Sequence, residues 1–195
     1  MGKGDQTKAH IIEKAAPIFN QHGYEGTSLS ELMIATGLKK GGIYRHFKNK
    51  EELAAAAFQH AWQLASSNRW TDIDERAGAV DQLKQYVSNF VEKRGGLVPG
   101  GCPVLNTAID SDDGNPALRD QVRKALARWM ERIQKIVASG IERGEIRKGA
   151  DPGETATVII STLEGALMIA RLDRSSHALN TAREHLVTYL ETLRA

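Results

Sequence analysis

Apolar residues recur along this chain every three or four positions, and no segment shows the strict alternation that is typical of a strand. Asn115-Pro116 and Asp151-Pro152 each place a capping residue before a proline at the first helical position. The spacing predicts helices over about 7–22, 28–37, 40–47, 50–68, 80–94, 102–109, 116–143, 153–172 and 176–193. We therefore expect an all-α fold, with residues 1–6 as a loose arm and a kink at Pro17 in the first helix.

Two of these helices are short and closely spaced, and their ends carry clear signals. Ser28 and Glu31 have the spacing of a capping box, and Gly37 suits a left-handed helix end. Asn49 with Glu52 repeats the capping pattern at the next helix. Two short helices joined by a tight glycine-containing turn are typical of a helix-turn-helix, whose second helix enters the DNA major groove. A buried helical hairpin would show the same spacing.

The chemistry of the second short helix favours DNA binding. Basic and hydrogen-bonding side chains crowd this helix and its ends, with no acidic residue among them: Lys39, Lys40, Tyr44, Arg45, His46, Lys48 and Lys50. Gly41 and Gly42 allow the backbone to approach a partner closely. Residues 1–50 hold eight basic and four acidic residues, although the net charge of the whole chain is only +2. The basic excess therefore coincides with the motif.

This stretch resembles the signature of the TetR (tetracycline repressor) family of bacterial transcription regulators. The matching segments are Thr27-Ser28-Leu29, Ala35-Thr36-Gly37-Leu38, Gly42-Ile43-Tyr44-Arg45-His46-Phe47 and Lys50-Glu51-Glu52-Leu53. Upstream, Ile12, Ala15, Ala16, Phe19 and Gly23-Tyr24 resemble the first helix of the family and its following turn. The resemblance is rich in motifs over about residues 8–55 and is architectural beyond them.

The resemblance implies an N-terminal helix-turn-helix DNA-binding domain of three helices over residues 1–49. A ligand-binding and dimerisation domain of six helices would follow over residues 50–195. The implied function is a transcriptional repressor that leaves its double-stranded operator DNA when a small-molecule or reactive-species effector binds. The alternative within this class is a transcriptional activator or a regulator without a diffusible ligand. Outside it, the alternative is a helical-bundle protein that binds a small molecule or acts as an enzyme.

The predicted DNA-binding residues are Thr27, Ser28, Lys39, Lys40, Gly41, Gly42, Tyr44, Arg45, His46 and Lys50. Thr27 and Ser28 would hold a phosphate through backbone N–H groups at the positive end of a helix. Tyr44 and Lys50 would also contact phosphate. Arg45 would read a base, since arginine pairs with guanine through two hydrogen bonds.

The resemblance also implies an effector cavity in the body of the protein. Its candidate lining residues are Phe58, Trp62, Tyr86, Phe90, Cys102, Asn106, Trp129, Ile133, Met168 and Arg171. Simple core packing is the competing interpretation for each of them. Cys102 follows Gly100-Gly101 and precedes Pro103, so it should lie at a helix start, where the dipole would favour an accessible, reactive thiolate. The alternative role for Cys102 is that of a small buried hydrophobic residue.

The helix expected over 153–172 has almost no polar face and must be covered on both sides. We therefore expect the last two helices to form a homodimer interface, where Gly165 and Ala166 permit close approach. A buried central helix in a monomer would explain the same composition.

Several classes of protein are disfavoured by the sequence. One cysteine excludes an intrachain disulfide, and the N-terminus has no apolar leader. No run of 18 apolar residues indicates a membrane span, so a cytoplasmic protein without a membrane partner is expected. No catalytic motif has supporting context, so we expect neither an enzyme nor a cofactor. The acidic loop from Asp110 to Gly114 lacks the spacing of a calcium site, so no metal is expected.

Overall fold

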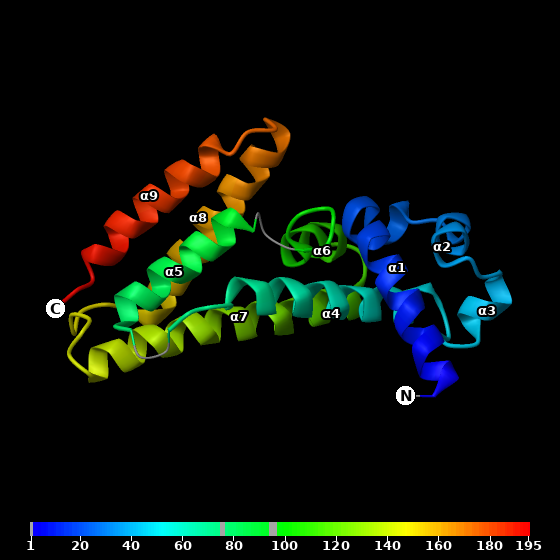
Figure 1. Cartoon of the computed structure of the whole chain (residues 1–195), viewed down its shortest axis with the longest axis horizontal. Coiled ribbons are helices and arrows are strands. Elements are labelled where there is room, and N and C mark those ends of the chain that lie inside the picture. Colours follow the sequence, from blue (N-terminus) through cyan, green and yellow to red (C-terminus); the bar gives the residue numbers. More distant parts are fainter. Residues whose placement is uncertain (1, 75–76, 94–96) are drawn as a thin grey trace. The chain divides into compact units, whose positions relative to one another are not determined.

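The computed structural model describes residues 2–74, 77–93 and 97–195 (Figure 1). Within these residues the chain forms nine α-helices and no strand, and its single β-bridge joins Ile146 to Arg194. The helices are α1 (Lys3–Gly26), α2 (Leu29–Thr36), α3 (Lys40–Tyr44), α4 (Lys50–Arg69), α5 (Ala79–Glu92), α6 (Pro103–Ser111), α7 (Pro116–Glu142), α8 (Pro152–Leu172) and α9 (His177–Glu191). The all-α prediction is confirmed. The predicted helix end at Arg94 lies outside the described residues.

Contacts divide the chain into two compact units, and each is described by itself. The first comprises Met1–Ala65 with Gly96–Ala125, and the second comprises Ser66–Gly95 with Leu126–Ala195. These units are defined by packing, not by function. The functional division at residues 49 and 50 therefore stays a prediction.

In the first unit α1 packs against α2 and α6, and α2 packs against α3. One hydrophobic core joins this unit. It contains apolar residues of α1, α2, α4 and the segment from α3 to Phe47, together with Val98. Its buried members are Ile11, Ala15, Ala16, Leu32, Ile43, Phe47, Leu53, Ala57, Ala61 and Val98. Helices as short as α2 and α3 are marginal in isolation. The shared burial of Leu32, Ile43 and Phe47 therefore holds them in place.

Two predictions about the start of the chain are wrong. Residues 3–6 belong to α1, where the Asp5 carboxylate accepts the Gly2 N–H at 3.1 Å and satisfies a donor at the helix start. The backbone departs from helical angles at Gly23, with φ 73° and ψ 178°, rather than at Pro17. A positive φ is easy for glycine, whereas an internal proline removes one hydrogen bond and can stay helical.

In the second unit α8 and α9 form an antiparallel pair, and α5 packs against both (Figure 1). Its buried core includes Leu83, Tyr86, Val87, Phe90, Trp129, Ile133, Leu163, Leu167, Leu186 and Leu190. Trp129 Nε1 donates to the Tyr86 hydroxyl at 2.6 Å. The buried Arg69 guanidinium lies 4.6 Å from the Phe90 ring centroid and 4.4 Å from that of Trp129. Glu164 lies 3.9 Å from it, so aromatic faces and a carboxylate surround this cation.

Asp151 is the N-cap of α8, and its carboxylate accepts the Glu154 N–H at 2.7 Å. Among the described helices it alone is long and apolar enough to cross a membrane by length and composition. The core helix of a globular protein meets the same criterion, and α8 packs against α9 and α5. It leaves Met168, Ile169 and Leu172 exposed, so one side of α8 is uncovered in the single chain.

The turn after α7 is tightly packed. A Cβ at Gly140 would lie 2.6 Å from the Cβ of Ala79 and 2.8 Å from Ile146 Cδ1. Glu145 binds Arg143 and also accepts the Ala79 N–H, each at 2.7 Å. These two hydrogen bonds lower the pKa of Glu145 to about 2. The corner between α7 and α5 therefore relies on a glycine and an ionised carboxylate.

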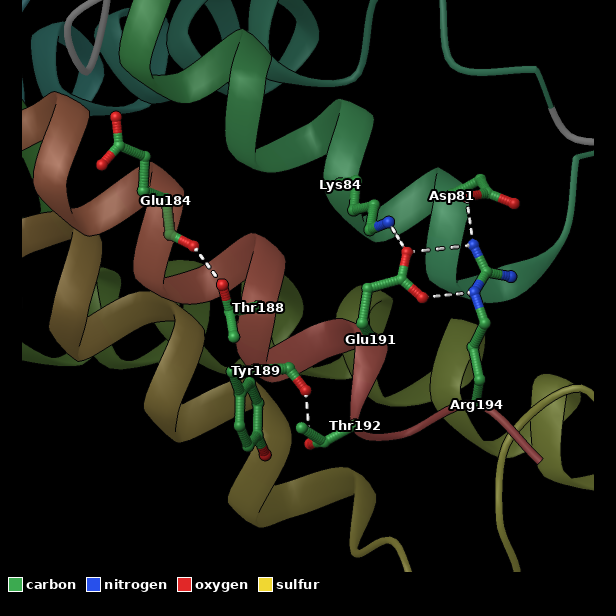
Figure 2. A network of polar contacts seen from close by, with 8 residues as sticks. All are labelled: Asp81, Lys84, Glu184, Thr188, Tyr189, Glu191, Thr192 and Arg194. Atoms are coloured by element: carbon green, nitrogen blue, oxygen red, sulfur yellow. Dashed lines mark hydrogen bonds and ion pairs between the residues drawn. The ribbon is translucent and has the colours of Figure 1, made fainter.

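The end of α9 is tied to α5. The Glu191 carboxylate pairs with both Lys84 and Arg194, and Arg194 also binds Asp81 at 2.6 Å (Figure 2). The Leu193 side chain is buried, and its carbonyl accepts a backbone N–H at 2.9 Å. The last residues of the chain are thus part of the packed second unit.

Candidate nucleic-acid interface

The start of α2 has the predicted capping box, with one consequence for DNA binding. Glu31 N donates to Ser28 Oγ at 3.2 Å, and the Glu31 carboxylate accepts the Ser28 N–H at 2.8 Å. His22 Nδ1 lies 3.1 Å from the same carboxylate. Hydrogen bonds from Ser28, more than the nearby His22, lower the pKa of Glu31. The Ser28 N–H is therefore occupied, and a phosphate would have to displace Glu31 to reach it.

Thr27 directly precedes the N-cap of α2, as predicted, and its side chain has a structural role. Its side chain is buried, and its hydroxyl donates to the Gly23 carbonyl at 2.7 Å. The residue therefore closes the bend at the end of α1 rather than presenting a hydroxyl to a partner. The prediction that Thr27 contacts phosphate concerned its backbone N–H and stays a prediction.

The turn between α2 and α3 follows the sequence closely. Gly37 has a φ of 69° and its N–H bonds to the Ile34 carbonyl, which is the left-handed cap expected there. His10 of α1 hydrogen-bonds the Thr36 carbonyl at 3.1 Å, so α1 also supports this turn. The Leu38 N–H donates to the Thr36 hydroxyl at 3.3 Å. Together these bonds fix where α3 begins.

α3 is shorter than predicted, because it ends at Tyr44 instead of residue 47. The side chains of Ile43, in α3, and of Phe47, in the turn after it, are both buried in the core. Lys48 N donates to Glu52 Oε2 at 2.7 Å, and Glu52 N donates to Asn49 Oδ1 at 2.8 Å. This capping at the start of α4 ends the preceding segment.

Because Ile43 and Phe47 face the core, the polar residues in and around α3 face outward. Lys39, Lys40, Gly41 and Arg45 are exposed, and Gly42, Tyr44, His46 and Lys50 are half-buried. The predicted DNA-binding residues of this segment therefore share one accessible, basic part of the first unit. α1 also contributes to this surface, although a loose arm was expected over residues 1–6. Lys3 and Thr7 line a groove of about 380 Å³ together with Leu38, Arg45 and His46.

Lys50 lies beside the end of α1. Its ammonium is 4.5 Å from the centre of the Tyr24 ring, a cation–π arrangement. Partial burial, followed by the charges of Glu51 and Glu25, raises the pKa of the Tyr24 hydroxyl. The Tyr24 ring thus remains a neutral support for the Lys50 side chain.

The ten predicted effector residues fall into different surroundings. In the first unit, Phe58 lines a cavity of about 20 Å³, which is room for about one water molecule. Asn106 does not line this cavity and instead donates to the carbonyls of Asn20 and Gly100, each at 2.8 Å. Trp62 is buried. Cys102 is at the start of α6 as predicted, and only 1% of it is exposed, so it has the burial of the alternative role, a small buried hydrophobic residue, rather than that of an accessible thiol.

The remaining candidates belong to the second unit. Tyr86, Phe90, Trp129 and Ile133 are buried core residues, and the first three meet through the Tyr86–Trp129 hydrogen bond and the stacked rings of Phe90 and Trp129. Met168 and Arg171 were predicted to line the cavity, and both are exposed on α8. They are exposed because, within the described chain, this side of α8 is not covered by another helix. Arg171 lines a groove of about 320 Å³ together with Leu167 and Leu179.

Groups of three metal-ligating side chains are absent from the part of the chain that the structure describes. What the first unit offers chemically is therefore hydrogen bonding and positive charge. Exposed cations around a short helix, with a glycine-rich backbone, suit an anionic polymer.

Comparisons with known proteins agree with this geometry. Residues 11–57 match the model described as "Bacterial regulatory proteins, tetR family", and residues 79–186 match "Tetracyclin repressor-like, C-terminal domain". A TetR transcriptional regulator from Chloroflexus aurantiacus is 42% identical, with a TM-score of 0.93 over 100% of this chain and 98% of that one. A TetR-family regulator from Cytophaga hutchinsonii is 34% identical, with a TM-score of 0.92 over the same shares.

Curated relatives point the same way. The HTH-type transcriptional repressor DhaR of Mycobacterium sp. is 25% identical over 89% of this chain and 86% of its own length. The HTH-type transcriptional repressor ComR of Escherichia coli is 30% identical over 82% of this chain and 77% of its own. With a basic helix-turn-helix in the first unit and family matches over both segments, the chain belongs to the TetR family of bacterial transcription regulators.

Proposed function

We propose that this protein is a homodimeric repressor that leaves its operator DNA when an effector binds to the body of the protein. TetR-family regulators bind operator DNA and generally act as dimers with small-molecule effectors. They are soluble cytoplasmic proteins and generally not enzymes. The observation that carries the proposal is the outward set of Lys39, Lys40 and Arg45 on a helix-turn-helix that is anchored by its own core.

In this proposal α3 enters the major groove and Arg45 reads a base, while Tyr44 and Lys50 contact phosphate. A gel-shift assay with the DNA that flanks the protein's own gene tests it, because repressors of this kind often regulate themselves. Wild-type protein should shift this DNA, and Tyr44→Ala should shift it more weakly. Lys148→Ala truncates an exposed side chain outside the proposed DNA and dimer surfaces and serves as the control. Equal affinity of wild type and Tyr44→Ala would remove Tyr44 from the interface.

The proposed dimer interface consists of α8 and α9. Its support is the uncovered side of α8, where 50% of Met168, 45% of Ile169 and 77% of Leu172 are exposed. A Cβ added at Gly165 would meet no other atom within 4 Å, so a second copy could approach the backbone there. A twofold homodimer carries two copies of α3, and an operator with two half-sites about 34–36 Å apart requires two.

The proposed effector is a small molecule or a reactive species. In the described conformation the cavity beside Phe58 has room for about one water molecule, so a larger effector would require the helices around it to move. Mild oxidant or a quinone tests the reactive alternative. Cys102 is buried, so it can act as the sensor only when α6 opens locally; in that case these reagents should release wild-type protein from DNA while Cys102→Ser stays bound. Equal behaviour of the two proteins would leave a non-covalent ligand as the effector.

A further inference from the structure

Helix α6 is bonded to α1 near both of its ends, within the first unit. Near its C-terminal end, the Asp110 carboxylate accepts the Tyr24 N–H at 2.6 Å. Nearer its start, the Asn106 amide donates to the Asn20 carbonyl at 2.8 Å and to the Gly100 carbonyl at 2.8 Å. α6 lies about 80 residues after α1 in the chain, so these bonds are tertiary and not local.

The hydrogen bond to the Tyr24 N–H lies directly after Gly23, the one residue inside α1 with non-helical backbone angles. Gly23 has a φ of 73°, and a Cβ built there would lie only 2.5 Å from Asp110 Oδ1. The carboxylate therefore packs directly against the bend as well as bonding to it. Any residue other than glycine would be strained by its backbone angles and would push Asp110 away.

The same bend is connected to the start of the helix-turn-helix. The Thr27 hydroxyl donates to the Gly23 carbonyl at 2.7 Å, and Thr27 is buried. Ser28, the next residue, is the N-cap of α2. A continuous series of contacts thus runs from Asp110 through Gly23 and Thr27 to the first turn of α2.

We propose that Asp110 is a positioning residue for DNA binding. It fixes the bend at Gly23, from which α2 and then α3 take their direction, and it does so without touching DNA. The inference rests on the proposed operator binding and adds a residue of α6 to the groups that determine it. Asp110 belongs to none of the motifs of the helix-turn-helix.

The start of α6 is held by a second group of bonds. The Asn20 amide is buried and donates to the carbonyls of Pro99 at 2.9 Å and Gly101 at 3.2 Å. Gly100 has a φ of 114°, and a Cβ there would lie 2.6 Å from the Asn20 carbonyl oxygen. The segment before α6 therefore lies directly on α1. A shift of α6 along its own axis must break bonds to α1, so an event that moves α6 changes the bend.

Three variants separate positioning from electrostatics. Asp110→Ala removes the hydrogen-bond acceptor and one negative charge, whereas Asp110→Asn keeps an acceptor oxygen and removes only the charge. Asp113→Ala removes one negative charge from an exposed residue in the turn after α6, and it is the matched control. Loss of a negative charge alone should leave DNA affinity unchanged or raise it. Loss of the positioning bond should lower affinity, so the two effects have opposite signs.

Operator affinity is measured for all four proteins at one fixed salt concentration. Asp110→Ala should bind roughly tenfold more weakly, the size expected for one hydrogen bond to a charged acceptor. Asp110→Asn and Asp113→Ala should bind at least as tightly as wild type. Weaker binding by Asp110→Ala together with wild-type binding by Asp110→Asn cannot result from the loss of charge, because both variants lose the same charge. Equal affinity of Asp110→Ala and wild type would overturn the inference.

Hydrogen exchange gives a second measurement that does not depend on DNA. The Tyr24 amide should exchange faster in Asp110→Ala than in wild type, while amides of α8 and α9 keep their wild-type rates. Faster exchange across both units would indicate general destabilisation and would overturn the positioning role. If wild-type protein bound no DNA, the proposed function would fail; if it bound and Asp110→Ala bound equally well, only the present inference would fail.

Discussion

Leu172 provides the strongest test of how this protein dimerises. It ends α8, and 77% of it is exposed in the single chain. Full burial of a leucine contributes about 1.5–3 kcal/mol, so covering Leu172 in a dimer would contribute about 1–2 kcal/mol per copy. A twofold interface contains the residue twice. Leu172→Ala keeps only part of this burial and should cost the dimer about 2 kcal/mol, which is roughly a thirtyfold higher Kd.

Sedimentation velocity over a range of protein concentrations, without DNA, measures this Kd directly. Ile34→Ala is the matched control, because Ile34 is a large apolar residue of α2 that is 83% exposed. It should leave the Kd of the dimer unchanged. A wild-type Kd for Leu172→Ala, or an equal loss in Ile34→Ala, would refute the assignment of α8 to the interface. A monomeric wild-type protein at micromolar concentration would refute the dimer itself.

Four further predictions concern other parts of the molecule. Lys50→Gln should lower the slope of log affinity against log salt by about one unit per subunit, whereas the exposed Lys148→Gln should not, as salt titrations of DNA binding will show. Gly140→Ala should destabilise the protein in urea by about 1–2 kcal/mol, because the cost of overpacking exceeds the gain in helix propensity. The pKa of Glu145 is about 2 in the folded protein, below its unfolded value, so its stabilising effect is present above about pH 4.3 and disappears as pH falls to the folded value. Urea titrations of wild type and Glu145→Gln should therefore differ at pH 7 and converge in acid. Cys102 should react with a thiol reagent far more slowly in native protein than in urea, since it is buried; equal rates would show that the thiol is accessible.

Local signals in the sequence predicted most of the helices and the helix-turn-helix. The Ser28–Glu31 capping box, the left-handed Gly37 and the Asn49 cap of α4 all depend on neighbours within four residues. Such features can be recognised from spacing alone. The prediction of α3 was too long because Phe47 continues the apolar spacing of a helix. Its side chain is buried beyond the helix end instead.

Features that depend on distant residues could not be predicted from the sequence. The sequence analysis assigned Asp110 to an acidic loop, whereas it lies in α6, and only the fold brings it to Tyr24, 86 positions earlier. Cys102 has the sequence environment of a reactive thiol, yet packing excludes solvent from it. Met168 and Arg171 carry no sequence signal that distinguishes a cavity from an uncovered helix side. Local spacing specifies an element, but its burial depends on which other elements cover it.

The bonds between α9 and α5 have a consequence for local unfolding of the second unit. Arg194 is bonded to both Asp81 and Glu191, Glu191 also pairs with Lys84, and Leu193 is buried (Figure 2). Local opening of α9 must break these bonds and expose Leu193, so this end of the helix opens less readily than one without such contacts. The helix that we assign to pairing with a second copy is therefore held in one conformation before the second copy binds.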